Sequence, residues 1–359
     1  MNETITRFQF FSILLLSGLG MLPVALTGWL GHLEGDAWVP VAASAAAGVL
    51  GLLVAHGASV ATGSLTLAEW AVARLGKLFG GCYVLLLAAA LYLWGCITFL
   101  EHWYMMAYMQ FSNTPFWLPG LFVLLVIGYM LSNGVASWAR VFQLLLVPVM
   151  TVLFVLLAAQ LWRADFGRLL PLGAGISRVG AADYAVSAFL LHGYVGYYFF
   201  RARTAPREGL FGAGLLAMSL SLIVLLLLVL LPIAVFDGRT SALFAYPFLE
   251  SLRTVNVTAL PLERVGFLLP LLLLVTSLCA MAVALHATMT SVCALFTRLN
   301  RRWTLIALLA LFVPLLILEP SRSALRIATL WWLPAPLLLV LAVPLAMWPF
   351  AARSRGAAR

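Results

Sequence analysis

The stretch SGLGMLP, residues Ser17–Pro23, lies in the middle of the first long hydrophobic segment of the chain, Phe8–Leu30. Two glycines and a proline weaken an α-helix at this depth, because glycine has a low helix propensity and proline lacks the backbone N–H. A later hydrophobic segment, Ala182–Phe200, carries LHGY at Leu191–Tyr194, in a comparable position. Corresponding breaks in two segments favour two interrupted membrane helices. The alternative is that these glycines serve close packing between continuous helices.

Hydrophobic segments of this kind recur along the whole chain. A bilayer core needs about 20 apolar residues per helix, because lipid offers the backbone no hydrogen-bonding partners. Of the 359 residues, 64% are hydrophobic and only 9% are charged, which excludes a soluble protein. The segments of sufficient length are Phe8–Leu30, Ala37–Ser59, Phe79–Met109, Phe116–Asn133, Ser137–Trp162, Ala182–Phe200, Leu210–Phe236, Val265–Phe296, Trp303–Leu318 and Ile327–Phe350. The sequence therefore predicts an all-α integral membrane protein with about ten transmembrane helices.

These segments form a single transmembrane domain over residues 1–359 and divide into two sets of five, in residues 1–162 and 163–359. Because five is odd, the second set enters the membrane from the side opposite to the first, as in an inverted repeat. The two interrupted segments are the first members of their sets. This predicts a 5+5 inverted repeat with broken helices one and six, which is the LeuT-like arrangement.

The basic residues set the orientation of the chain. With the N-terminus inside, thirteen of them fall in cytoplasmic pieces and eight on the opposite side. The inner group is Arg7, Arg74, Lys77, Arg140, Arg201, Arg203, Arg207, Arg298, Arg301, Arg302, Arg353, Arg355 and Arg359, and the outer group is Arg163, Arg168, Arg178, Arg239, Arg253, Arg264, Arg322 and Arg326. This excess predicts that both termini are cytoplasmic. The net charge of +9 is scattered singly between apolar runs, so it predicts no nucleic-acid-binding surface.

Interrupted helices expose free backbone groups, which indicate a kind of ligand. Each half-helix end presents free N–H or C=O groups beside one pole of the helix dipole. Such a pair of ends binds the carboxylate and the ammonium of a zwitterion, so the predicted ligand is a small amino acid or a comparable polar metabolite. The sequence has no Ser/His/Asp arrangement, glycine-rich phosphate loop or HExxH motif. No enzyme activity, cofactor or metal site is predicted.

Ionisable side chains within the hydrophobic segments are further candidates, because burying them in lipid is costly. Glu101, toward the outer end of the third segment, either faces the site or relays a proton, or it extends to the outer interface. His192 either lines or gates the site, or it is a hydrogen-bonded packing histidine. His286, Thr290 and Ser291 form a possible secondary cation site; the alternative is that the hydroxyls bond back to their own helix.

The connection over residues 237–264 is too polar to span the membrane. Its apolar residues recur at helix-like spacing, at Leu243, Phe244, Phe248, Leu249 and Leu252. This pattern predicts an amphipathic helix on the outer surface that forms a lid or a partner surface. The alternative is a docked loop without this role.

Short motifs along nearly the whole chain carry a family resemblance. They are the Gly18–Pro23 stretch, Asp36-Ala37-Trp38, Gly76-Lys77-Leu78 with Gly80 and Tyr83, Thr114-Pro115 with Trp117, Leu169-Leu170-Pro171 with Gly175-Ile176, Tyr246-Pro247, Leu249-Glu250, Leu252-Arg253 and Glu263-Arg264. In order and spacing the chain resembles the GerAB-type spore germination permeases, which are the B subunits of nutrient germinant receptors. That family belongs to the amino acid/polyamine/organocation transporter superfamily.

The resemblance implies a subunit of the spore inner membrane that recognises a nutrient between spans one, three, six and eight. It also implies two partners, an A-type subunit with a large soluble part and a C-type lipoprotein. The implied nutrient site comprises Gly18, Gly20, Met21, Glu101, Phe189, His192, Gly193 and Tyr194. Relatives often have Gly-Glu where this chain has Gly193-Tyr194, so the polar chemistry of its pocket differs.

Three functions are compatible with these features. The first is a germinant-sensing receptor subunit, and the second is a secondary transporter of amino acids, coupled to protons through Glu101 or His192. The third is a membrane scaffold with a vestigial pocket, against which the interrupted helices argue. The preference for sensing over transport rests on the family resemblance.

Overall fold

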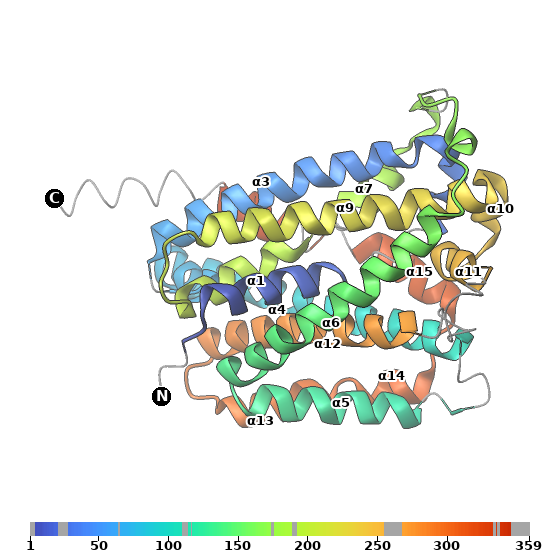
Figure 1. Ribbon diagram of the computed structural model, residues 1–359. Coiled ribbons are helices and arrows are strands. Elements are labelled where there is room, and N and C mark those ends of the chain that lie inside the picture. Colours follow the sequence, from blue (N-terminus) through green and yellow to red (C-terminus); the bar gives the residue numbers. More distant parts are fainter. Residues whose placement is uncertain are drawn as a thin grey trace.

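The computed structural model describes residues 4–20, 28–63, 65–109, 114–115, 117–173, 176–188, 192–254, 268–332, 335 and 338–345. Helices lie side by side in a bundle, and the blue and red ends of the sequence are interleaved with its middle (Figure 1). The elements are α1 (Arg7–Gly18), η1 (Gly31–Asp36), α3 (Trp38–Thr62), α4 (Leu67–Met109), α5 (Trp117–Ser132), α6 (Val135–Leu161), η2 (Phe166–Leu169), η3 (Ile176–Arg178), α7 (Ala181–Ala188), η4 (His192–Tyr194), α8 (Val195–Phe200), η5 (Arg201–Arg203), α9 (Leu210–Phe236), α10 (Gly238–Leu243), α11 (Pro247–Arg253), α12 (Leu268–Leu295), α13 (Arg301–Ala310), α14 (Val313–Leu318), α15 (Arg322–Trp332) and the π-helix η7 (Leu338–Ala342).

Within these described residues, six stretches of helix are long and apolar enough to cross a membrane. They are Trp38–Val60, Leu67–Tyr108, Val135–Leu161, Leu210–Phe236, Leu268–Leu295 and Arg301–Leu318. The shorter α5 is also apolar. Large hydrophobic side chains such as Phe122, Leu144 and Phe154 are more than two-thirds exposed on the sides of the bundle, where lipid covers them. The prediction of an all-α integral membrane protein is confirmed.

α1 and α12 form the interior of the bundle. Most side chains of both helices are buried, from Gln9 to Gly18 in α1 and from Leu269 to Ser291 in α12. A helix that is apolar on every side has to be enclosed by other helices. α12 packs along α4, and α1 packs against α6, α9 and α12. The first interrupted helix therefore lies at the centre of the molecule.

A short helical segment that begins at Leu67 precedes the third predicted span, Phe79–Met109, within α4. Gly76 (φ 77°, ψ 173°) separates a short first segment from the main helix. That segment folds back closely, since a Cβ placed on Gly80 would lie 2.5 Å from the Ala71 carbonyl oxygen. The predicted span therefore agrees with the main helix, and only the short segment was not predicted: its exposed charges at Glu69, Arg74 and Lys77 are typical of a loop, whereas it buries its apolar side on the bundle.

Gly76 provides a test of this turn. Its conformation is open almost only to glycine, so Gly76→Ala is expected to cost about 1–3 kcal/mol, although no atom lies within 4 Å of the added Cβ. Gly212→Ala is the matched control, because its Cβ also meets open space but stands in the regular helix α9. The control should be neutral or slightly stabilising. Thermal unfolding in detergent measures both, and equal midpoints would contradict the strained turn.

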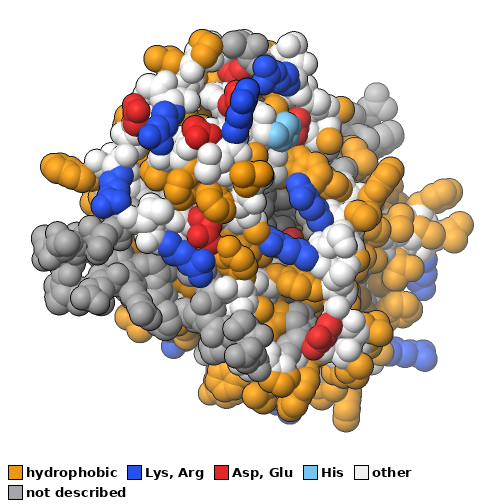
Figure 2. Space-filling model, turned by 90° about the vertical axis from the view of Figure 1, so that its right-hand side faces the viewer, with side chains coloured by type: hydrophobic (Ala, Val, Ile, Leu, Met, Phe, Trp, Pro, Cys, Tyr) orange, Lys and Arg blue, Asp and Glu red, His pale blue; other side chains and the backbone are white. Residues whose placement is uncertain are grey.

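Polar groups gather at the two ends of the bundle, named here after the predicted topology. At the inner end, near the N-terminus at the left of Figure 1, the Ile5 N–H donates to the Arg203 carbonyl (2.9 Å) and Arg201 donates to the Ser59 carbonyl (2.5 Å). At the outer end, Glu34 pairs with Arg178 (3.9 Å) and Arg239 (3.8 Å). Figure 2 shows this end, with acidic and basic side chains intermixed.

Two short helices, α10 and α11, occupy the outer end within the predicted amphipathic segment. Phe248, Leu249 and Leu252 of α11 are buried, whereas Leu243 of α10 is 84% exposed. The Asp237 side chain caps α10 by accepting a hydrogen bond from the Thr240 N–H (2.8 Å). Residues 255–264 lie outside the described residues. The lid or partner role of this segment stays a prediction.

Candidate functional site

The first interrupted helix, α1, begins and ends at points that the sequence explains. Thr6 and Gln9 form a capping box, in which the Thr6 hydroxyl accepts from the Gln9 N–H (3.2 Å) and Gln9 Oε1 accepts from the Thr6 N–H (2.9 Å). The helix ends at Gly18, inside the predicted Ser17–Pro23 stretch. Helical structure is present again from residue 28. α1 is therefore a half-helix whose carboxyl end lies within the bundle.

The second interrupted helix consists of α7, the 3₁₀ turn η4 and α8. α7 ends at Ala188, and η4 leads into α8 at Val195. Every residue from His192 to Phe200 is buried. Because η4 lies against α1, both predicted breaks fall in the interior of the protein.

The two breaks meet at a pair of glycines. A Cβ placed on Gly193 would lie 2.8 Å from the Leu14 carbonyl oxygen and 3.7 Å from the Gly18 Cα. A Cβ on Gly18 would lie 3.8 Å from the Gly193 Cα and 3.1 Å from the Ser221 hydroxyl oxygen. Only glycine allows two backbones to approach this closely. We call Gly18–Gly20 together with His192–Tyr194 the helix crossing.

Two further helices border the helix crossing. A Cβ on Gly20 would lie 3.1 Å from the Ala280 Cβ, so the end of α1 rests on α12. The ring of Trp94, on α4, stands edge-on to His192, with centroids 4.7 Å apart. Elements of spans one, three, six and eight thus come together. Met21 and Phe189 of the predicted site lie outside the described residues.

Buried hydroxyl groups near the helix crossing lack hydrogen-bond partners within the part of the chain that the structure describes. They belong to Thr98, one turn beyond Trp94 on α4, and to Ser277 on α12. The buried Tyr194 hydroxyl also lacks a hydrogen-bond partner among the described residues, and the Tyr194 ring packs on Gly51 of α3. Buried polar groups are normally paired, so such atoms indicate where a polar ligand can bind. Trp94, Thr98 and Ser277 were not predicted as site residues, and their one signal in the sequence is a polar atom inside an apolar segment.

Glu101 does not belong to the helix crossing. It follows Trp94 by seven residues on α4, which is a rise of roughly 10 Å toward the outer end. Its side chain lines a cavity at the outer end, together with Arg322 and Arg326 of α15. The structure therefore separates Glu101 from the other predicted site residues that it describes.

The predicted secondary site lies at the inner side of α12. His286 Nδ1 is 3.2 Å from an Arg301 guanidinium nitrogen, and the ring stacks on Phe200 at 5.2 Å. The Ser291 hydroxyl donates to the carbonyl of Ala287 (2.8 Å), its own helix. Thr290 lines a cavity of about 270 Å³ that Glu69, Arg203 and Arg301 also line. Arg203 and Arg301 lie beside this cluster, and their positive charges disfavour the binding of a cation. The secondary cation site stays a prediction.

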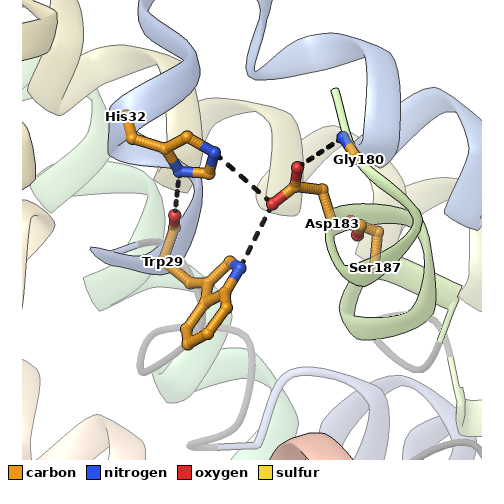
Figure 3. A network of polar contacts seen from close by, with 5 residues as sticks. All are labelled: Trp29, His32, Gly180, Asp183 and Ser187. Carbon is orange, nitrogen blue, oxygen red and sulfur yellow. Dashed lines mark hydrogen bonds and ion pairs between the residues drawn. The ribbon is translucent and has the colours of Figure 1, made fainter. Parts of the chain in front are cut away.

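A polar network connects the segments that flank the two breaks (Figure 3). Asp183 of α7 accepts hydrogen bonds from the Trp29 indole N–H (3.2 Å) and the Gly180 N–H (2.8 Å). His32 Nε2 lies 3.5 Å from the same carboxylate. Trp29 and His32 follow the first break, whereas Asp183 precedes the second. The carboxylate, which is 7% exposed, therefore joins the outer half-helices of both interrupted helices.

A helical bundle in which two interrupted helices cross near its centre is the architecture of secondary transporters with a LeuT-like fold. The chain belongs to the spore permease family, because the family model described as "Spore germination protein" matches residues 4–324. This confirms the resemblance inferred from the sequence motifs.

Solved structures share the fold, and one of them is a transporter. Mhp1, a nucleobase-cation-symport-1 family transporter in a closed conformation with bromovinylhydantoin bound, superimposes with a TM-score of 0.60. The match covers 98% of this chain and 94% of Mhp1, at 13% sequence identity, so it shows the shared fold alone. No curated protein sequence matches the chain.

Proposed function

We propose that this protein is the nutrient-sensing B subunit of a spore germinant receptor. In this proposal it lies in the spore inner membrane with both termini in the cytoplasm, and it binds a small amino acid or similar nutrient at the helix crossing. Membership of the spore germination family supports the physiological role. The observation that carries the site is the close approach of Gly18 and Gly193, two broken helices meeting inside the bundle.

The chemistry of the helix crossing suits a zwitterion. The carboxyl end of α1 carries the negative pole of its dipole, which favours the ammonium group of a ligand. The hydroxyls of Thr98 and Ser277, which have no hydrogen-bond partner among the described residues, offer hydrogen bonds to further polar atoms of a ligand. In this proposal, the packed rings of Trp94 and His192 contact the aliphatic part of the ligand. These groups support a small amino acid as the class of ligand.

Signalling then requires only that the nutrient bind one conformation of the protein better than the other. The outer half-helices move as one unit in this proposal, because Asp183 joins them. An A-type subunit and a C-type lipoprotein read this change. The outer segment over residues 237–264 is the proposed surface for a partner or a lid.

The alternative function is proton-coupled transport of an amino acid through the same site. The observation that favours it is the fold shared with Mhp1, which is a transporter. In this alternative, Glu101 or His192 carries the proton. Binding would be the same as for a sensor, so only movement across the membrane separates the two functions.

Equilibrium binding and uptake of a radiolabelled mixture of the twenty amino acids test this proposal. We expect the purified protein to bind the mixture and proteoliposomes not to accumulate it, with or without a proton gradient. Gly20→Leu should weaken binding about tenfold or more. Its Cβ would lie 3.1 Å from the Ala280 Cβ, so the rest of the leucine side chain would enter the helix crossing. Gly212→Leu, which points into open space, is the control. Gradient-driven accumulation would establish transport instead, and unchanged binding by Gly20→Leu would exclude the helix crossing as the site.

A further inference from the structure

A cavity of about 410 Å³ opens at the outer end of the bundle, on the face shown in Figure 2. It is enclosed by the segment after the first break, by α4, by α10 and the residues following it, and by α15. Its lining residues are Gly28, Trp29, Glu101, Ala242, Leu243, Phe244, Ala245, Arg322, Ser323, Arg326, Thr329 and Leu330. None of the described helix-crossing residues lines it, so it is a separate place in the molecule.

Glu101 supplies a carboxylate to this cavity. The residue is only 8% exposed. Within the described ranges, no hydrogen bond or ion pair reaches its side chain. A buried carboxylate is costly unless a cation or several hydrogen-bond donors compensate it. Arg322 and Arg326 act on this carboxylate at longer range than an ion pair, and an ammonium group bound in the cavity would pair with it directly.

Arg322 and Arg326 supply two positive groups to the same cavity. They are four residues apart on α15, so they share one face of that helix. The Arg322 guanidinium lies 4.4 Å from the ring centroid of Tyr246 and donates to the Ala245 carbonyl (3.3 Å). The Arg326 guanidinium lies 4.3 Å from the ring centroid of Trp29.

These contacts hold the two guanidinium groups without adding a negative charge, and Glu101 acts on them only across the cavity. Burial raises the pKa of Tyr246 well above its ordinary value, so the ring under Arg322 is an uncharged phenol. The Trp29 indole is itself fixed by Asp183, at 3.2 Å. Stacking occupies the faces of the guanidinium groups and leaves N–H groups at their edges for a carboxylate. Among the described residues, neither arginine forms an ion pair with an acidic side chain.

We propose that this outer cavity is an amino-acid site in its own right, where Arg322 and Arg326 bind the ligand carboxylate and Glu101 binds its ammonium group. The site goes beyond the proposed sensing at the helix crossing and holds equally for a transporter. One carboxylate faces two guanidinium groups, so the lining of the cavity carries a net positive charge. An acidic amino acid neutralises it fully, and we expect L-glutamate to bind more tightly than L-alanine, and L-lysine more weakly than both.

Ligand titrations on the full-length protein in detergent test this site, with thermal stabilisation as the readout. The probes are L-glutamate, L-alanine, propionate and propylamine. Both amino acids should stabilise the protein, and Arg326→Gln should weaken L-glutamate binding about tenfold or more. Glu101→Gln should weaken the binding of both amino acids, because it removes the partner of their ammonium group. The same substitution should strengthen the binding of propionate, because it removes a charge that repels the carboxylate and leaves the two arginines in place. A loss of packing alone would not give these opposite effects.

Arg239→Gln is the matched control, because it removes the same charge at the same end from a side chain that is 94% exposed and outside the cavity. The proposal is overturned if neither amino acid stabilises the wild type, or if Arg326→Gln and Arg239→Gln bind L-glutamate equally. Gly20→Leu separates the two sites. If Gly20→Leu abolishes L-glutamate binding and Arg326→Gln does not, the outer site is wrong. If Gly20→Leu keeps L-glutamate binding and Arg326→Gln loses it, the outer site is supported, and the helix crossing is tested separately by the labelled mixture.

A labelling measurement keeps the proposal testable should an arginine variant fold poorly. Ser323→Cys is placed in the cavity wall after the four native cysteines are changed to serine. An anionic methanethiosulfonate should modify it faster than a cationic one of similar size, and L-glutamate should slow the reaction. Equal rates for the two reagents, without protection by L-glutamate, would contradict an anion-attracting binding cavity.

Discussion

Gly193→Ala is expected to destabilise the protein by about 1–3 kcal/mol and to weaken nutrient binding about tenfold or more. The added Cβ would lie 2.8 Å from the Leu14 carbonyl oxygen, which is a backbone atom and cannot rotate away. Relief requires α1 and η4 to move apart, which opens the helix crossing. Thermal unfolding in detergent and binding of the labelled amino-acid mixture measure the two effects.

Gly95→Ala is the matched control for this substitution. Gly95 is also buried within a membrane helix, α4, but its Cβ would meet Ala284 at an ordinary distance of 3.5 Å. The control should unfold at or above the wild-type temperature. If Gly193→Ala behaves like Gly95→Ala in both measurements, the two interrupted helices do not depend on close contact at this point.

Asp183→Ala is expected to cost about 2–4 kcal/mol, because it leaves the N–H groups of Trp29 and Gly180 without their acceptor. Asp183→Asn keeps one carbonyl oxygen and should lose about half as much. Thermal unfolding measures the stability. Nutrient binding should weaken in parallel, since the network holds the outer halves of both interrupted helices together.

Asp165→Ala provides the comparison for Asp183→Ala. Asp165 also accepts a backbone hydrogen bond, from Gly167 at 3.0 Å, but its side chain is 64% exposed and water can replace it. Its loss should cost less than about 1 kcal/mol. Similar losses of stability for the two variants would show that the Asp183 network does not join the half-helices.

Local composition made most of the fold predictable. Long apolar runs located the spans, and the glycines and the proline of Ser17–Pro23 located the end of α1, because both signals act within one helix. The short segment of α4 before Gly76 was not predicted, because an amphipathic segment with exposed charges resembles a loop. The division into halves at residues 1–162 and 163–359 stays a prediction.

The candidate site was less predictable, because its contacts join distant parts of the chain. Gly18 and Gly193 were identified as breaks, but their mutual approach follows only from the fold. The Trp29–Asp183 bond spans 154 residues, and no local pattern signals it. Glu101 was assigned to the nutrient site by resemblance, whereas the fold places it beside Arg322 and Arg326. Arg322 and Arg326 had been counted only as topology signals.

Hydrogen–deuterium exchange of the full-length protein, with and without the mixture of twenty amino acids, tests the central claim most directly. The claim is that the nutrient binds where α1 and η4 meet, so exchange should slow in peptides covering residues 14–20 and 192–200. Peptides over residues 242–245 and 322–330 report separately on the outer cavity. Protection at the helix crossing is the predicted result; protection confined to the outer peptides, or to neither region, would contradict it.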